Sequence, residues 1–315
     1  MGQMGDVVTE PERYAWPNDA RAATVITFDL DAESGVLGDF PAAAARLGIM
    51  SHQIYGPRTG LPRLLRILDR RQITATFFVP GFTAERHPDA VRAIRDAGHE
   101  IAHHGYLHER VTGRPEAEEE GFLLRGIEAL EKVAGVRPVG WRAPMWEVNY
   151  RTPALLARNG FLYDSSLMDA DRPYLMAAGD AEDGATIVEV PVHWSLDDGE
   201  QYAWLPGIWE GTTIENPRKV LDMWTQEFDA VVGEGECFVL TNHPFLSGRP
   251  SRARALDGLL GHIKETPRVW ITQAGELAAF VAGLELPAVR HEPPLPSGQS
   301  SGGQIIPGRP KGGYT

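Results

Sequence analysis

Two histidines and two aspartates stand at spacings that suit a metal site. His104 and His108 are the first and last residues of the pentapeptide HGYLH. On one helical turn, residues four apart point the same way. Asp29 and Asp31 close the apolar run TFDLD, and in a strand residues i and i+2 share a face. One carboxylate and two imidazoles make a three-ligand site with a position open for water, as catalytic zinc sites have.

Strands and helices that alternate along the chain must position these residues. Short β-branched or apolar runs predict strands, and amphipathic segments that end near glycine predict helices. The expected strands are residues 24–28, 74–79, 100–103, 139–142, 187–190, 238–241 and 269–272. The expected helices are residues 61–71, 88–97, 116–134, 153–159, 217–232, 252–264 and 273–282. This order predicts an α/β fold, a distorted (β/α) barrel of about seven or eight strands with the helices outside.

Residue types that bind metals or transfer protons stand at the ends of four expected strands. They are Asp29 and Asp31, His104 and His108, Arg142, and His243. Active sites of (β/α) barrels lie at the C-terminal ends of the strands. We therefore expect these side chains to meet in one pocket.

Composition and charge narrow the class of protein. The chain has 315 residues, 43% of them hydrophobic, which is enough for a large core, and its net charge of -13 disfavours a nucleic-acid partner. No apolar run reaches the roughly 18 residues of a membrane span, so we expect no membrane partner. Residues 1–17 are polar and do not resemble a signal peptide, and the single Cys237 excludes an internal disulfide. These features predict a cytoplasmic protein.

The chain divides into one large domain and two extensions. We expect an N-terminal extension over residues 1–13, a catalytic domain over 14–282, and a tail over 283–315 that is rich in Pro, Gly and Ser. The tail composition predicts flexibility or packing across a neighbouring subunit. Residues 169–184 and 195–211 show no regular pattern, and long irregular loops of this kind often form lids or binding loops.

Four motifs in order resemble those of the NodB-type polysaccharide deacetylases. TFDLD, HGYLH, RAP and LTNHP follow one another as in that family, over residues 14–282. WPN, DSSL and GRPSR make the chain most similar to the branch with peptidoglycan-deacetylase-like and allantoinase-like members. One motif departs from the family, in which two aspartates are commonly adjacent, because Leu30 separates Asp29 from Asp31. The resemblance implies a barrel that hydrolyses the C–N bond of an N-acetyl group with a metal, and a homo-oligomer, since relatives in this branch form tetramers.

The resemblance also implies a role for each residue of the metal site. Asp31, His104 and His108 would hold a divalent metal, with zinc favoured and cobalt, nickel, iron or manganese also suited to these ligands. Asp29 would be the general base that takes a proton from the metal-activated water. The two aspartates could also exchange these roles.

Two further residues acquire roles by resemblance. Arg142 would pair with the base aspartate, because a guanidinium offers a planar fork to a carboxylate; the alternative is a purely structural salt bridge. His243 would be the general acid for the leaving amine, since the ordinary histidine pKa near 6.5 suits proton transfer. The alternative is a buried histidine whose ring hydrogen-bonds to the backbone.

Candidate substrate contacts lie in the expected loops. Aromatic residues in these loops should rim the pocket, where aromatic faces suit sugar rings or flat heterocycles, although ordinary packing is an alternative for each. They are Trp146, Trp194, Tyr202, Trp204 and Trp209. Glu33 continues the alternation of the two aspartates and is a further candidate. Asp197 and Asp198 follow Trp194, and one of them could orient a catalytic group or simply face solvent.

We expect a metal-dependent deacetylase that acts on a polysaccharide or an N-acetyl amino sugar. The rival function is hydrolysis of a small cyclic imide or ureide by the same residues, as in allantoinase-like relatives. The expected lack of an export signal favours the rival, because cell-wall glycan lies outside the membrane. A catalytically inactive carbohydrate-binding protein would have lost a ligand, Asp29 or His243, and none is lost. A Rossmann oxidoreductase would need a glycine-rich turn where DLD stands.

Overall fold

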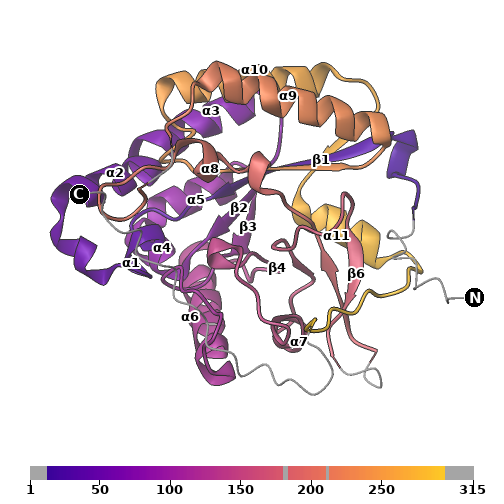
Figure 1. Ribbon diagram of the computed structural model, residues 1–315, viewed down its shortest axis with the longest axis horizontal. Helices are drawn as coiled ribbons and strands as arrows, with labels where there is room; N and C mark the ends of the chain where they lie inside the picture. Colours follow the sequence, from indigo (N-terminus) through magenta and orange to yellow (C-terminus); the bar gives the residue numbers. More distant parts are fainter. Residues whose placement is uncertain (1–12, 180–183, 211–212, 295–315) are drawn as a thin grey trace, which may run out of the picture.

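A curled, mostly parallel sheet forms the centre of the molecule (Figure 1). The computed structural model describes residues 13–179, 184–210 and 213–294. The strands in these residues are β1 (Ala22–Asp29), β2 (Thr76–Val79), β3 (Glu100–His103), β4 (Gly140–Trp141), β5 (Tyr163–Asp164), β6 (Tyr174–Ala177), β7 (Thr186–Glu189), β8 (Cys237–Asn242) and β9 (Val269–Thr272). Their order is β6-β7-β5-β4-β3-β2-β1-β8, and β9 also pairs with β1.

Helices surround this sheet, with α9 and α10 side by side over one end (Figure 1). The α-helices in the described residues are α1 (Ser34–Leu37), α2 (Leu47–Tyr55), α3 (Leu61–Arg71), α4 (Gly81–Arg86), α5 (Pro88–Asp96), α6 (Glu116–Ala134), α7 (Thr152–Arg158), α8 (Asp198–Tyr202), α9 (Pro217–Glu234), α10 (Pro250–Glu265) and α11 (Ala274–Ala282). Single helical turns cover Pro17–Asp19, Pro41–Ala45, Gly56–Gly60, Pro144–Trp146 and Trp194–Leu196. The longest helix, α6, ends where the sequence predicts, before left-handed Gly135.

The strand β1 has three strand partners in the sheet and sets the position of the site. All eight of its residues are buried, as expected for a parallel strand with helices on both faces. It pairs in parallel with β2, β8 and β9. The register places Asp29 beside Phe78 of β2 and Phe28 beside Asn242 of β8. The C-terminal ends of β1, β2 and β8 therefore lie at one edge of the sheet.

The predicted α/β barrel class is confirmed, with three differences in detail. The end strands β6 and β8 are not neighbours in the sheet of the described residues, so the curled sheet is open there. Two strands were not predicted, because β5 has only two residues and β6 is a short strand antiparallel to β7. The prediction that residues 169–184 and 195–211 are irregular throughout was wrong, since they contain β6 and α8.

The described part of the C-terminal tail packs on its own chain. The Val289 N–H donates a hydrogen bond to the carbonyl of Leu175 over 2.7 Å, and the Ala177 N–H donates to the carbonyl of Val289 over 2.8 Å. These bonds add a short stretch of the tail to the edge of β6, where the composition had indicated flexibility or contact with a neighbour. Residues 1–12 of the expected N-terminal extension and 295–315 of the tail lie outside the described residues.

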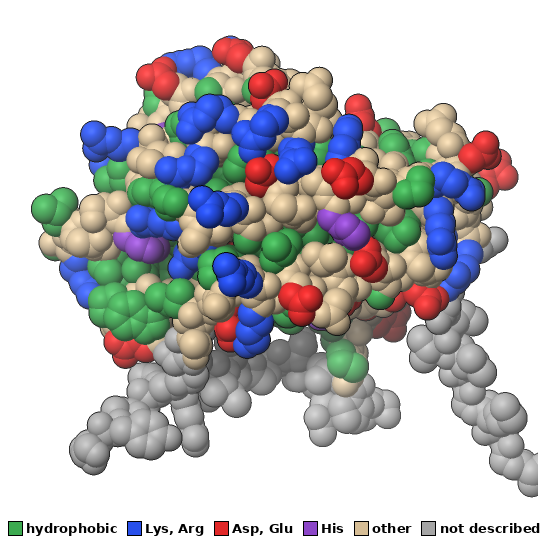
Figure 2. Space-filling model, turned by 90° about the horizontal axis from the view of Figure 1, so that it is seen from above, with side chains coloured by type: hydrophobic (Ala, Val, Ile, Leu, Met, Phe, Trp, Pro, Cys, Tyr) green, Lys and Arg blue, Asp and Glu red, His purple; other side chains and the backbone are tan. Residues whose placement is uncertain are grey.

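Charged side chains cover the face formed by α3, α9 and α10. Figure 2 looks onto this face and shows Lys and Arg side chains interspersed with acidic ones. Arg70 and Arg71 of α3 both pair with Asp257 of α10, at 2.8 and 2.7 Å, and so join the two helices. Within the described ranges, none of the helices is both long and apolar enough to span a bilayer.

A close approach between α6 and β3 supports the loop that carries the two histidines. A Cβ added at Gly126 would collide with Nε2 of His103 and lie 2.9 Å from the carbonyl oxygen of Gly105. We expect Gly126→Ala to lower the free energy of unfolding by about 1–3 kcal/mol, because a buried side chain must move. Gly121→Ala on the same helix meets nothing within 4 Å and should raise it by about 0.5–1 kcal/mol. Urea denaturation of both variants measures the contrast, and equal stabilities would contradict the steric explanation.

Candidate functional site

The loop after β3 brings the two histidines together without a helix. The prediction that HGYLH forms one helical turn was wrong, because Gly105 and His108 both have positive φ, at 72° and 59°. Left-handed φ is easy for glycine and uncommon for histidine. Side chains fix the loop from within: His103 Nδ1 accepts from the Gly105 N–H over 3.1 Å, and Glu109 accepts from the Tyr106 N–H over 3.0 Å.

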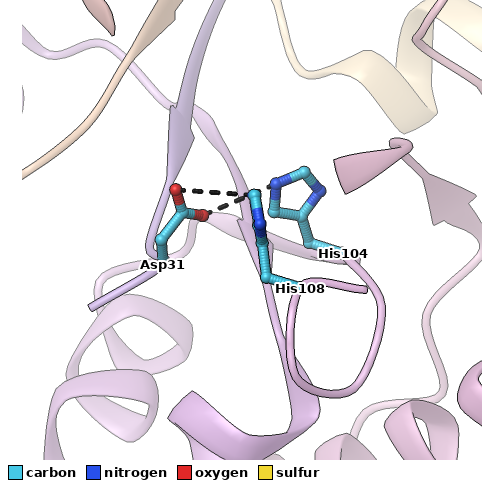
Figure 3. Close-up of side chains that lie close together, drawn as sticks. All are labelled: Asp31, His104 and His108. Atoms are coloured by element: carbon cyan, nitrogen blue, oxygen red, sulfur yellow. Dashed lines mark ion pairs between the residues drawn. The ribbon is translucent and has the colours of Figure 1, made fainter. Parts of the chain in front are cut away.

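Asp31 and the two histidines face one another in the buried centre of the site (Figure 3). His104 Nε2 lies 3.5 Å from Asp31 Oδ1, and His108 Nε2 lies 3.7 Å from Asp31 Oδ2. One ligand atom from each residue falls within a group spanning at most 4.8 Å. These separations are too long for direct hydrogen bonds, and they suit three ligands that converge on one cation.

The protonation of the two histidines fits a bound divalent metal. Burial lowers the pKa of His104 and of His108 well below the ordinary histidine value, so both rings are in the neutral form that ligates metals. Nδ1 of His104 donates to the carbonyl of Arg142 over 2.8 Å, which leaves the Nε2 lone pair directed at Asp31. Burial raises the pKa of Asp31 to about 7, against an opposing effect of His243. Asp31 Oδ1 finds no hydrogen-bond donor among the described residues, and a cation would satisfy it.

Asp29 stands beside this ligand set and is held by Arg142. The Arg142 guanidinium is fully buried and donates from Nη1 to Asp29 Oδ1 over 2.8 Å and to Thr27 Oγ1 over 2.9 Å. Its Nε and Nη2 donate to the carbonyl and the hydroxyl of Ser165, over 3.1 and 2.9 Å. The expected pairing of Arg142 with Asp29 is therefore present. Asp29 Oδ2 remains directed toward the site, 3.7 Å from His104 Nε2.

His243 follows β8 and approaches the carboxylate of Asp31. Its Nδ1 donates to Asp198 Oδ1 over 2.7 Å, and its Nε2 lies 3.5 Å from Asp31 Oδ2. Burial alone would lower the pKa of His243, but Asp197 and Asp198 outweigh it and raise the pKa well above the ordinary value. The ring is therefore protonated on both nitrogens, with Nδ1 committed to Asp198 and the Nε2 proton facing the pocket.

An apolar cavity of about 300 Å³ opens above these polar groups. Trp146 and Trp194 both line it and stack on each other, with ring centroids 5.1 Å apart and an interplanar angle of 17°. Trp209 and Phe245 form another part of the wall and also stack, at 6.3 Å. The metal donor set, Asp29 and His243 all contribute to the lining. The cavity can thus hold a ring-shaped molecule against aromatic faces, with an acceptor and a donor of protons within reach.

The structure places Glu33 outside this cavity. Its carboxylate is buried and accepts hydrogen bonds from Arg86 Nε over 2.6 Å and from His87 Nε2 over 2.7 Å. Burial tends to raise the pKa of Glu33, but these two bonds outweigh it and lower the pKa to about 2. The alternation with Asp29 and Asp31 ends because the chain turns into α1 at Ser34. Glu33 therefore joins the loop after β1 to α4 and does not contact the substrate pocket.

Some residues of the site had no definite role from the sequence. Phe245 was not singled out, although it follows His243 by only two residues. Of the other loop aromatics expected at the rim, Trp209 lines the cavity, whereas Tyr202 and Trp204 do not. For Asp198 the sequence left two roles open, and the structure shows it fully buried against His243. Ser165 was noticed only as part of DSSL, and its contacts with Arg142 depend on the neighbouring strands β4 and β5.

The chain is similar to several known proteins. The family model described as polysaccharide deacetylase matches residues 55–163. A peptidoglycan deacetylase of Helicobacter pylori is 32% identical over 267 residues, which cover 78% of this chain and 91% of that protein. The crystal structure of a putative polysaccharide deacetylase from Mycobacterium smegmatis shares 51% identity at a TM-score of 0.87, covering 91% of this chain and 99% of that one. The structure of Puue allantoinase shares 25% identity at a TM-score of 0.74, covering 86% and 93%.

Proposed function

Because this chain belongs to the polysaccharide deacetylase family, we propose that it uses a divalent metal ion to remove the acetyl group from an N-acetylated amino sugar of a glycan. Membership makes it a hydrolase of carbon–nitrogen bonds other than peptide bonds. One observation on this chain supports the use of a metal and of the two proton-transferring residues. The Asp31, His104 and His108 donor set lies between a carboxylate held by arginine and a histidine held by aspartate.

The ligands proposed for the metal are Asp31, His104 and His108, and zinc is the first candidate among the ions that these residues suit. When bound, such an ion lowers the pKa of a water molecule and polarises the acyl carbonyl. Cobalt, nickel, iron and manganese are alternatives that metal analysis of the purified protein distinguishes.

In the proposed reaction Asp29 and His243 move the protons. Water adds to the acyl carbon and gives a proton to Asp29, whose Oδ1 stays fixed by Arg142. The carbon–nitrogen bond then breaks as the nitrogen takes the Nε2 proton of His243, and the amine and acetic acid leave. The proton held by Asp29 returns to His243 through solvent, and the acetic acid ionises to acetate in solution. Asp198 keeps His243 oriented through the bond to Nδ1. The stacked Trp146 and Trp194 offer a face for the sugar ring.

The proposal predicts release of acetate from N-acetylglucosamine oligomers or peptidoglycan fragments by the metal-loaded protein. The rate should fall to background after removal of the metal with a chelator and return when zinc or cobalt is added. Succinimide and hydantoin serve as the comparison substrates for the cyclic imide and ureide alternative. Rapid hydrolysis of either, with no acetate from the glycans, would contradict the deacetylase proposal. Sugar binding without turnover of either class would favour an inactive carbohydrate-binding protein.

The expected homo-oligomer and the expected cytoplasmic location stay predictions. Light scattering of the full chain and fractionation of cells that contain it measure them directly.

A further inference from the structure

Two buried carboxyl groups that the proposed reaction does not use lie at the same edge of the sheet. Asp164 is the last residue of β5 and Glu189 the last of β7. These strands are parallel neighbours, and the register sets the two residues side by side. Both side chains are completely buried. Two adjacent buried carboxylates would repel each other if both were ionised, so the contacts around them must explain why both are present.

Each group uses one oxygen to hold the turn that follows β5. Asp164 Oδ1 accepts from the Ser166 hydroxyl over 2.6 Å. Glu189 Oε1 accepts from the Ser166 and Leu167 N–H groups, over 3.0 and 2.9 Å. The second oxygens, Asp164 Oδ2 and Glu189 Oε2, have no hydrogen-bond donor in the described part of the chain, and the pairing of β5 with β7 sets the two residues next to each other. A single proton between them would satisfy both.

The turn held in this way binds the side chain of Arg142, which follows β4. Ser165 accepts from Arg142 at both its carbonyl and its hydroxyl, and Ser166 Oγ accepts from the Ala143 N–H over 2.9 Å. Arg142 in turn fixes Asp29. We propose that Asp164 and Glu189 share one proton as an acid–carboxylate pair, and that this pair is a positioning device that aims Arg142 at Asp29. The positioning half of this inference rests on the proposed function, in which Asp29 is the base.

The charges around the pair favour retention of a proton. Burial raises the pKa of Asp164 to about 7, although the hydrogen bonds to it and the charge of Arg142 act in the opposite direction. Burial also raises the pKa of Glu189 well above its ordinary value, and Asp164 and Asp169 add to the effect. Tyr174 of β6 faces the pair as a neutral phenol, because burial raises its pKa. Arg142 is a cation that acts on Asp164, and it is also bound to Asp29.

The first test compares how stability depends on pH in the wild type and in Glu189→Gln. The amide keeps the oxygen that accepts from Ser166 and Leu167, and its NH₂ can donate permanently to Asp164. A carboxyl group whose pKa is raised in the folded state stabilises the fold at low pH. This contribution to stability is lost as the pH rises through the pKa of the folded state. Between about pH 5 and 7, below the raised pKa of Asp164, the unfolding equilibrium constant of the wild type should therefore rise about tenfold more per pH unit than that of Glu189→Gln. Equal slopes would overturn the shared proton.

The second test separates positioning from simple support of the fold. Glu189→Ala should lower kcat at least about tenfold, with KM changed less than about twofold, because the base is misplaced and the pocket is intact. Glu189→Gln should restore most of kcat. Glu119→Ala is the matched control, since Glu119 is also buried but binds Asn149 and Thr152 away from Arg142. It should lower the melting temperature and leave kcat of the folded protein unchanged. The same pattern for Glu189→Ala would overturn the positioning role.

An NMR measurement tests whether the pair holds Arg142, even if the protein proves not to be a deacetylase. The Arg142 Nε–H group is buried and bonded to Ser165, so its NMR signal should be sharp in the wild type, in Glu189→Gln and in Glu119→Ala. In Glu189→Ala it should broaden or exchange rapidly with solvent. If Glu189→Ala does not fold, Ser166→Ala takes its place, because it removes both the link to Asp164 and the link to Ala143. An unchanged Arg142 signal in these variants overturns the inference, whether or not the wild type releases acetate.

Discussion

Asp29→Asn should lower the turnover of an N-acetylated substrate by about 10²- to 10⁴-fold and leave about one divalent metal ion bound per chain. The asparagine oxygen can still accept from Arg142 Nη1, so the shape of the site is kept. The amide cannot take a proton from water, and no other carboxylate is held by Arg142 in the described residues. Initial rates of acetate release, together with elemental analysis of the same sample, measure both effects.

The result also decides which aspartate holds the metal. Asp31 belongs to the donor set with the two histidines, whereas Asp29 Oδ1 is engaged by Arg142. Loss of metal along with turnover would mean that Asp29 is a ligand and that the two roles are reversed. Asp257→Asn is the control, because it also removes a carboxylate paired with arginine, on the helical face far from the cavity lining. It should retain activity and bound metal.

The double variant His104→Ala/His108→Ala should lose nearly all bound metal, from about one ion per chain to less than about a tenth. Two of the three converging ligand atoms disappear, and Asp31 alone is a weak ligand. Acetate release should fall to the background rate with the metal. Elemental analysis after incubation with zinc or cobalt measures the metal, and circular dichroism checks that the variant is folded.

A matched control excludes adventitious binding to other histidines. His262 lies on α10, is partly exposed and pairs with Asp229 over 2.6 Å. His262→Ala should keep both the metal and the activity. A double variant that still binds one ion per chain would show that the metal lies elsewhere, and the proposed role of HGYLH would have to be abandoned.

Long amphipathic segments and apolar runs were sufficient to predict most of the fold. The pattern of α6 gave both ends correctly at residues 116 and 134, and the strand at 269–272 was also correct. Short elements were missed, because the two residues of β5 and the five of α8 carry no detectable period. The helical spacing of His104 and His108 was misleading, since the left-handed φ of Gly105 turns the chain into a loop. Spacing alone cannot distinguish a helical turn from a tight loop that joins the same two residues.

The sequence by itself determined the types of the reacting groups and their positions at strand ends. In a parallel sheet the ends of neighbouring strands share one edge, so Asp29 and Arg142 were expected to meet although 113 residues separate them. Only the tertiary structure decided which carboxylates support them. Asp198 reaches His243 across 45 residues, and Asp164 meets Glu189 through a strand register that the residues do not reveal. A carboxylate in a loop looks the same in the sequence whether it faces solvent or a buried partner, because burial and pKa depend on the packing around it.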